Sequence, residues 1–323
     1  MQVLITGAGG FVAPHLIQHI QLTQPDAIIH GSYHAQQPDT LDDVHYYQLD
    51  LLDYHAVRMW LETVQPDVVY HLAGQSSPGR AFDAKWRTLE TNIRIQHNLL
   101  EAYLALNMRP RTLIMSSGYI YCGGSLTPDH MPVNETAELR PNNPYALSKV
   151  TQDLMGLQYF LSHRLPIIRV RPFNHTGPGQ QPAFVAPDFA LQIARIEAGL
   201  QEPVMWVGNL EAQRDFTDVR DVVRAYILLS QYGQAGIAYN VASNQAYSIQ
   251  QVLDTLLSFT QAHITVEVDP SKFRPVDIPI VQGDNTRLVQ LTGWQPTIPF
   301  EQTLHDLLED CRKRVQSITR SNE

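Results

Sequence analysis

The sequence predicts an α/β protein with a doubly wound parallel sheet and a smaller, mixed α/β domain. Short β-rich runs alternate with helical patterns through the first half of the chain, and a glycine turn joins the first run to the first helical pattern. The alternation loosens beyond residue 170, where Pro and Gly cluster at 172–187. Strands that alternate with helices are typical of βαβ units, which build parallel sheets.

The expected elements follow one another in a regular order. Strands are expected at 3–6, 27–30, 45–48, 67–72, 112–116 and 167–171, and helices at 12–22, 54–63, 85–107 and 145–163. We expect two domains, 1–170 and 171–323, with segments near 218–242 returning to the first.

Composition excludes several classes of protein. The 323 residues are 44% hydrophobic and carry a net charge of -9, which argues against nucleic-acid binding. No run of 18 apolar residues occurs, and the first residues, MQVLITGAGG, have neither a basic segment nor a cleavage site, so we expect no membrane span and no signal peptide. The cysteines are Cys122 and Cys311 alone, which favours a reducing, cytoplasmic location. The 13 histidines show no zinc-binding spacing, so no metal site is expected.

The glycine turn "TGAGGFVAP" indicates a dinucleotide site. Gly7 and Gly10 match the first two glycines of a G-x-x-G-x-x-G loop, and Ala13 replaces the third. Glycine lets the backbone approach a pyrophosphate, which the following helix N-terminus stabilises. The alternative is a plain strand-to-helix turn. With the βαβ pattern, the motif favours a Rossmann-like dinucleotide-binding domain over residues 1–170.

The choice between NAD(H) and NADP(H) stays open. The segment "HGSYHAQ" after the second expected strand holds neither the acidic residue that binds a ribose hydroxyl nor an arginine for a 2′-phosphate. Asp50 and Asp53 in "QLDLLD" can hydrogen-bond the adenine side, although Asp53 can equally cap a helix.

The stretch "NNPYALSK" places a phenol and an ammonium one helical turn apart. Asn143 is a plausible N-cap and Pro144 suits the first turn. Tyr145 and Lys149 then share a helix face, and we expect the ammonium to lower the pKa of the phenol below about 10. The pair can exchange a proton with a substrate oxygen, or it can be an accidental pair on a solvated face.

Taken in order, "TGAGGFVAP", "DLLD", "HLAGQSS", "MSSGYIY" and "YALSK" resemble the extended short-chain dehydrogenase/reductase family. The resemblance covers essentially the whole chain. It implies a catalytic triad of Ser117, Tyr145 and Lys149, in which the serine polarises the substrate oxygen, the tyrosine transfers the proton and the lysine stabilises the phenolate. By itself, the Ser117 hydroxyl could also cap a turn.

The resemblance also implies which residues contact an NADP(H) or NAD(H) cofactor. They are Gly7, Gly10, Phe11, Val12, Asp50, Leu51, Leu72, Ala73, Gly74, Tyr145, Lys149 and His175, the last of which is expected at the nicotinamide half.

The downstream segments 171–194, 208–226 and 274–284 resemble family members that act on GDP-linked 6-deoxyhexoses. The resemblance implies that residues 171–323 form a mainly sugar-nucleotide-binding domain, and it implies substrate contacts from Ser117, Asn174, Arg214, Arg274 and Asp277. Either arginine can clamp a diphosphate bidentately, although each taken singly could instead form a surface salt bridge.

Two residues after the triad serine bear on the reaction. Family dehydratases carry an acidic pair or Ser-Glu there, and C3/C5 epimerases carry a cysteine at the second position. Here these positions are Gly118 and Tyr119, and Cys122 lies outside the matching slot. The resemblance therefore implies reduction of the C4 ketone of GDP-4-keto-6-deoxy-D-mannose to GDP-D-rhamnose. GDP-mannose 4,6-dehydration, C4 epimerisation and a catalytically silent dinucleotide sensor remain the alternatives.

Family members commonly dimerise through a four-helix bundle, which implies a homodimer through helices 85–107 and 145–163. The apolar positions Ile93, Leu99, Leu100 and Tyr103 fit that interface and equally fit a helix packed on its own sheet.

Overall fold

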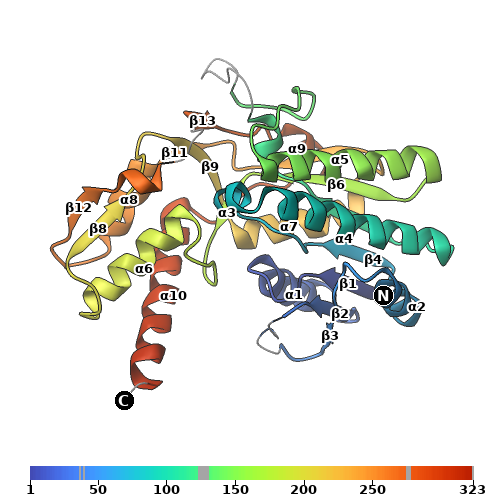
Figure 1. Ribbon diagram of the computed structural model, residues 1–323, viewed down its shortest axis with the longest axis horizontal. Coiled ribbons are helices and arrows are strands. Elements are labelled where there is room, and N and C mark those ends of the chain that lie inside the picture. The colour runs from blue at the N-terminus through green and yellow to red at the C-terminus, as the bar shows by residue number, and fades with distance from the viewer. Residues whose placement is uncertain (36–37, 39–40, 123–130, 274–277, 322–323) are drawn as a thin grey trace.

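A computed structural model describes residues 1–35, 38, 41–122, 131–273 and 278–321. Seven parallel strands form the main sheet in the order β10-β6-β5-β4-β1-β2-β3 (Figure 1). Their bounds are β1 Gln2–Thr6, β2 Ile28–Tyr33, β3 Val44–Gln48, β4 Val68–His71, β5 Arg111–Met115, β6 Ile167–Pro172 and β10 Ala238–Val241. The order reverses between β1 and β4, which makes the sheet doubly wound.

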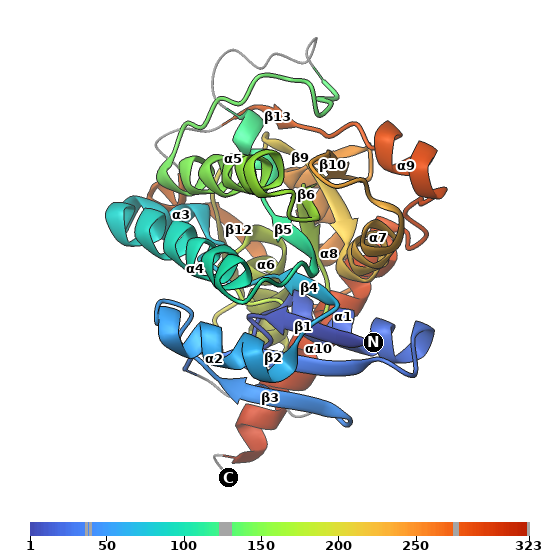
Figure 2. The same ribbon diagram turned by 90° about the vertical axis from the view of Figure 1, so that its right-hand side faces the viewer.

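Helices cover both faces of this sheet (Figure 2). The helices α2 (Tyr54–Val64), α4 (Lys85–Ala105) and α5 (Pro144–His163) pack on one face, and α1 (Val12–Thr23) and α7 (Val219–Tyr232) pack on the other. The strands are apolar on both sides because each face is covered: Leu4 faces one core and Ile5 the other.

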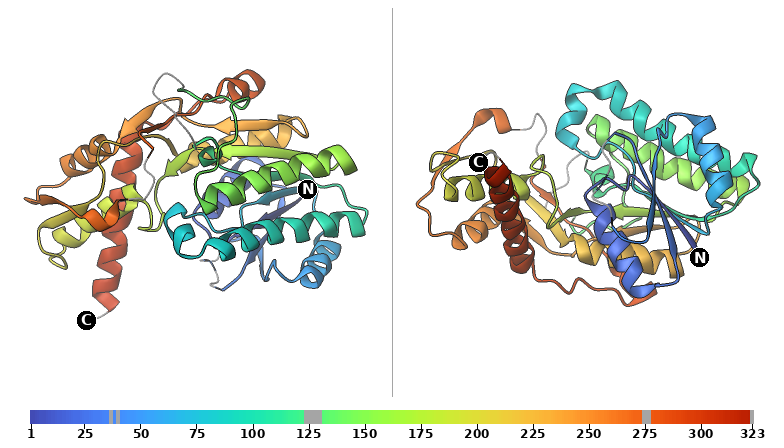
Figure 3. Two further views of the ribbon diagram at one scale, coloured as in Figure 1. Left: turned by 45° about the horizontal axis from the view of Figure 1, so that its top comes forward. Right: turned by 90° about the horizontal axis from the view of Figure 1, so that it is seen from below.

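The remaining segments build a second lobe beside the strand ends (Figures 1 and 3). A small mixed sheet contains β7 (Asn174–Thr176), β9 (Gln213–Asp218), β11 (Ala246–Ser248) and β13 (Ile280–Val281), and β8 (Val204–Val207) pairs with β12 (Thr265–Val268). The helices α6 (Val185–Glu197), α8 (Ile249–Ser258) and α10 (Phe300–Ser321) share a second apolar core.

The predicted fold class is confirmed, and all ten expected elements occur within a few residues of their expected bounds. The short helix α3 (Pro78–Asp83), capped by Ser77, was not expected because six residues carry too little periodicity to recognise. The short helices η1 (Gly118–Tyr121), η3 (Pro270–Lys272) and α9 (Thr286–Thr292) complete the described chain. None of the described helices is long and apolar enough to span a bilayer.

Candidate active site

The glycine turn between β1 and α1 leaves a hollow, the cradle, that a side chain in place of glycine would obstruct. Gly7 has a φ of 72°, and a Cβ on it would lie 2.8 Å from the Cα of Ala73. The first turn of α1 has neither a side-chain cap on Phe11 nor an acidic residue. Its N–H groups are therefore available to an anion such as a pyrophosphate.

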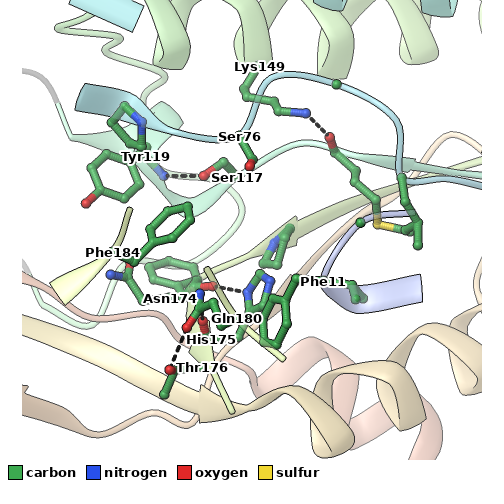
Figure 4. A pocket seen from close by; sticks show the side chains of 18 of the residues that line it. Phe11, Ser76, Ser117, Tyr119, Lys149, Asn174, His175, Thr176, Gln180 and Phe184 are labelled. Atoms are coloured by element: carbon green, nitrogen blue, oxygen red, sulfur yellow. Dashed lines mark hydrogen bonds between the residues drawn. The ribbon is translucent and has the colours of Figure 1, made fainter. Parts of the chain in front are cut away.

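A pocket of about 260 Å³ opens beside this turn, at the carboxyl ends of β1, β4, β5 and β6. Such strand ends are the usual ligand site of doubly wound sheets. The predicted site residues that line it are Gly7, Gly10, Phe11, Val12, Leu72, Gly74, Ser117, Tyr145, Lys149, Asn174 and His175. The fold thus brings all three members of the expected triad to one cavity, and Figure 4 shows Ser117 and Lys149 at its upper side.

The caps of η1 and α5 determine where Ser117 and Tyr145 lie at the pocket. Ser117 caps η1 directly after β5, and its Oγ accepts a hydrogen bond from the backbone N of Tyr119 at 3.2 Å (Figure 4). Asn143 caps α5 by accepting from the backbone N of Ala146 at 2.9 Å, with Pro144 in the first turn, as predicted. Tyr145 then enters the cavity from the first turn of that helix.

The pKa of Tyr145 differs from the sequence-based expectation. Burial raises the pKa of the phenol to about 12, and a hydrogen bond with Ser117 only partly opposes this rise. The expected lowering by Lys149 is wrong, because loss of solvation by the buried phenol is the largest cause of the shift and the charge of Lys149 is not among its causes. The phenol is consequently protonated at neutral pH, which is the form that a proton donor needs.

Lys149 is buried beside the phenol, and burial lowers its pKa to about 8. Its Nζ donates to the carbonyl O of Met115 at 2.9 Å, as the dashed line in Figure 4 shows. The neighbouring His71 is fully buried, and desolvation followed by the charge of Lys149 lowers its pKa to about 3. This histidine therefore stays neutral and adds no second cation.

His175 is held as a neutral acceptor. Its ring stacks on Phe11 at a centroid distance of 6.1 Å, and its Nδ1 lies 3.0 Å from the carbonyl O of Phe173. A carbonyl only accepts, so Nδ1 carries the hydrogen and Nε2 keeps its lone pair. Burial lowers the pKa of His175, which keeps this tautomer neutral.

Comparison with known proteins now places the chain. The family model described as GDP-mannose 4,6 dehydratase matches residues 4–307. The GDP-6-deoxy-D-mannose reductase of Pseudomonas aeruginosa is 35% identical over 98% of both chains. The chain belongs to the GDP-mannose dehydratase family of extended short-chain dehydrogenases/reductases. It is an NAD(P)-dependent oxidoreductase of nucleotide-sugar metabolism.

Solved members of this superfamily share the whole architecture. The structure of RMD from Pseudomonas aeruginosa complexed with NADPH has a TM-score of 0.84 and 34% identity, and covers 97% of this chain and 99% of that one. The UDP-glucose 4-epimerase of Thermus thermophilus in complex with NAD has a TM-score of 0.85 at 25% identity, with coverage of 97% and 99%. The family's relatives thus include structures with either nicotinamide cofactor.

Several expected family site residues lie outside the pocket. Ala73, Asp50, Leu51 and Arg214 are not among its lining residues. The exposed Asp50 accepts from the backbone N of Leu52 at 2.9 Å, and Asp53 caps α2, so its capping interpretation is correct. Arg214 is buried and donates to the carbonyl O of Gln213 and of Ile278, each at 2.7 Å. Arg274 and Asp277 lie outside the described residues.

The fold also brings to the active site residues that the sequence did not predict. Asn92 of α4 holds the turn after β4: its Oδ1 accepts from the N of Gln75 at 2.8 Å, and its Nδ2 donates to Ser148 at 2.9 Å. No signal in the sequence singles it out, because the buried face of α4 also holds Thr88, Gln96 and Asn98. Gln180 and Phe184 also line the pocket, and they come from the Pro- and Gly-rich stretch 172–187.

Proposed function

We propose that the protein reduces the C4 ketone of GDP-4-keto-6-deoxy-D-mannose to GDP-D-rhamnose, with a reduced nicotinamide dinucleotide as the hydride donor. The observation that carries the proposal is the make-up of the pocket. Ser117, Tyr145 and Lys149 all line it, whereas none of its described lining residues is Asp or Glu. Such a lining can polarise and protonate a ketone, and among its described residues none offers a carboxylate for the elimination of water.

The proposed roles follow from the hydrogen bonds. The Ser117 Oγ accepts from the backbone N of Tyr119, and its own hydrogen, which here bonds the Tyr145 oxygen, would be donated to the substrate oxygen. Tyr145, protonated at neutral pH, would transfer its proton to that oxygen, and the chemistry that a reduced nicotinamide would supply in this pocket is the hydride. Lys149 then stabilises the phenolate by its positive charge.

The two residues after Ser117 support reduction over dehydration. A Cβ on Gly118 would lie 2.9 Å from the ring of Phe173, so an acidic side chain cannot occupy that position without displacing the ring. Tyr119 lines the pocket where dehydratases carry glutamate. Burial raises the pKa of the Cys122 thiol to about 12, so it is unsuited to act as a thiolate base for epimerisation.

The cofactor site is proposed on the same cradle. The backbone of Gly7 and Gly10 and the first turn of α1 would hold the pyrophosphate, and Lys149 would hold the nicotinamide ribose. His175, with a lone pair on Nε2, would lie at the nicotinamide half. Asn174 lines the substrate side of the pocket, while Arg214, Arg274 and Asp277 remain predicted contacts to the nucleotide. NADPH and NADH both stay candidates.

We further propose a homodimer formed through α4 and α5. Leu99, Leu100 and Tyr103 of α4 are buried within the chain, so these positions pack on their own sheet. The outer face of α5 instead carries leucines every seven residues, Leu147, Leu154 and Leu161, which are 44%, 45% and 57% exposed. A heptad stripe of this kind is the pattern that a helix bundle buries. The cytoplasmic location stays a prediction from composition.

Progress curves test the reaction. The purified protein is mixed with enzymatically prepared GDP-4-keto-6-deoxy-D-mannose and either NADPH or NADH, and cofactor oxidation and the sugar nucleotide are followed together. Stoichiometric oxidation with formation of GDP-D-rhamnose supports the proposal. Accumulation of the 4-keto-6-deoxy sugar from GDP-mannose would identify a dehydratase, and turnover without consumption of reduced cofactor would identify an epimerase.

A further inference from the structure

A buried carboxylate lies on the helix that carries the expected catalytic residues. Asp153 follows Lys149 by one turn and Tyr145 by two turns of α5, so the three side chains share one face of the helix. The side chain of Asp153 is fully buried, with 0% exposed. A charge in such a place is costly unless it is fully paired.

Two arginines of β6 satisfy this carboxylate. Oδ1 accepts from Nη1 of Arg169 at 2.6 Å and from Nη2 of Arg171 at 2.9 Å, and Oδ2 accepts from Nε of Arg171 at 2.8 Å. The contact of Arg171 is bidentate, which fixes orientation as well as distance. Asp153 therefore attaches α5 to β6 in one geometry.

The same network reaches the turn that presents Ser117. Nη1 of Arg171 donates to the hydroxyl of Tyr121 at 2.7 Å, and that hydroxyl donates to Oδ1 of Asn240 at 2.9 Å. Tyr121 is the last residue of η1, which Ser117 caps. One set of charge-assisted bonds thus joins the helix of Tyr145 and Lys149 to the turn of Ser117.

The arginines also keep Asp153 away from Lys149. A carboxylate and an ammonium four residues apart on a helix ordinarily pair. Here Nζ of Lys149 donates to the carbonyl O of Met115 instead, and burial lowers its pKa with no opposing contribution from Asp153. With Asp153 neutralised by two guanidinium groups, the charge of Lys149 remains available at the pocket.

We propose that Asp153 is a positioning residue: held by Arg169 and Arg171, it fixes α5 against β6 and η1 so that Tyr145 and Lys149 meet Ser117 at one substrate oxygen. It acts through these residues and does not line the pocket. The inference rests on the proposed reductase function for its kinetic consequence, although the placement of Lys149 can be tested without any substrate.

Asp153→Asn tests the proposal, with Asp221→Asn as the matched control. Asp221 of α7 is also fully buried, and it pairs with Arg224 at 2.6 Å and with the backbone N of Thr297 at 2.9 Å. Both substitutions remove one buried charge and keep the shape of the side chain. Both should lower the melting temperature, but the control does not touch the elements that carry the triad.

The expected result is a kinetic difference at equal folding. Below both melting temperatures, Asp153→Asn should lower kcat by up to about 100-fold because the reacting groups are misplaced. Asp221→Asn should keep the wild-type kcat. Equal loss of kcat in the two variants, or wild-type kcat in Asp153→Asn, would overturn the proposal.

A second readout needs no substrate. Hydrogen–deuterium exchange followed by mass spectrometry reports how firmly α5 and η1 are held. Exchange in η1 and in the first turns of α5, which carry Tyr145 and Lys149, should be faster in Asp153→Asn and stay at the wild-type rate in Asp221→Asn. If the wild-type protein reduces no ketone but this local difference appears, the proposed function fails and the positioning role stands; equal exchange in the two variants overturns the positioning role. Tyr121→Phe, which removes one hydroxyl from the network, should speed exchange in η1 in the same way and serves if Asp153→Asn does not fold.

Discussion

Replacing Lys149 by methionine should make the protein more stable at neutral pH. The lysine side chain is 7% exposed, and burial lowers its pKa from 10.5 to about 8. Folding at pH 7 therefore buries an ammonium that prefers water. This shift in pKa corresponds to about 3 kcal/mol of lost stability, which a methionine of similar length does not incur.

The lost hydrogen bond reduces the gain. Nζ of Lys149 donates to the carbonyl O of Met115 at 2.9 Å, and leaving that acceptor unpaired costs about 1 kcal/mol. A net stabilisation of about 2 kcal/mol at pH 7 follows from these two magnitudes. The variant should nevertheless lose reductase activity, because residues that serve catalysis often lower the stability of the folded protein.

The pH dependence of the gain identifies its cause. The folded pKa is the lower one, so wild-type stability contributed by this group is fully present above pH 10.5 and is lost as the pH falls to about 8. The advantage of Lys149→Met should thus be constant below about pH 8 and disappear toward pH 10.5. Urea unfolding of both proteins, near pH 7 and near pH 10, measures this.

The exposed Lys85 supplies the matched control, since Lys85→Met should change stability little at either pH. A Lys149→Met protein that is less stable than wild type near pH 7 would refute the reasoning. An equal gain in stability at both pH values would also refute it, because a gain that comes from packing alone does not depend on pH.

Three further outcomes are expected. Tyr145→Phe should lower kcat for ketone reduction by about 10²–10⁴-fold without weakening dinucleotide binding, as measured by steady-state kinetics and cofactor titration. Gly7→Ala should abolish dinucleotide binding, because the new Cβ lies 2.8 Å from the Cα of Ala73 in a backbone conformation that alanine disfavours; isothermal titration calorimetry and a thermal melt check this. Leu154→Arg should convert a dimer to a monomer in multi-angle light scattering, whereas Leu22→Arg, at an 80% exposed position on α1, should not; an unchanged mass for Leu154→Arg contradicts the proposed interface.

Local sequence patterns were enough to predict the frame of the fold. The cap at Asn143 and the proline beside it determine where α5 begins, because they satisfy backbone groups within one turn of the chain. The same holds for Asp53 and the start of α2. The spacing of Tyr145 and Lys149 on one helix face also follows from helical geometry alone.

Tertiary structure decided the chemistry of these groups. Whether the pKa of Tyr145 rises or falls depends on how much solvent the packed chain removes, and no local pattern gives that quantity. Long-range pairing likewise joins residues from separate elements: Arg214 donates to the carbonyl O of Ile278, and Asp153 forms ion pairs with Arg169 and Arg171. Sequence by itself therefore determined the order of the elements and the residues offered for catalysis. Only the folded chain decided which of them share a cavity and in which protonation state, because burial and long-range pairing arise from contacts between distant segments.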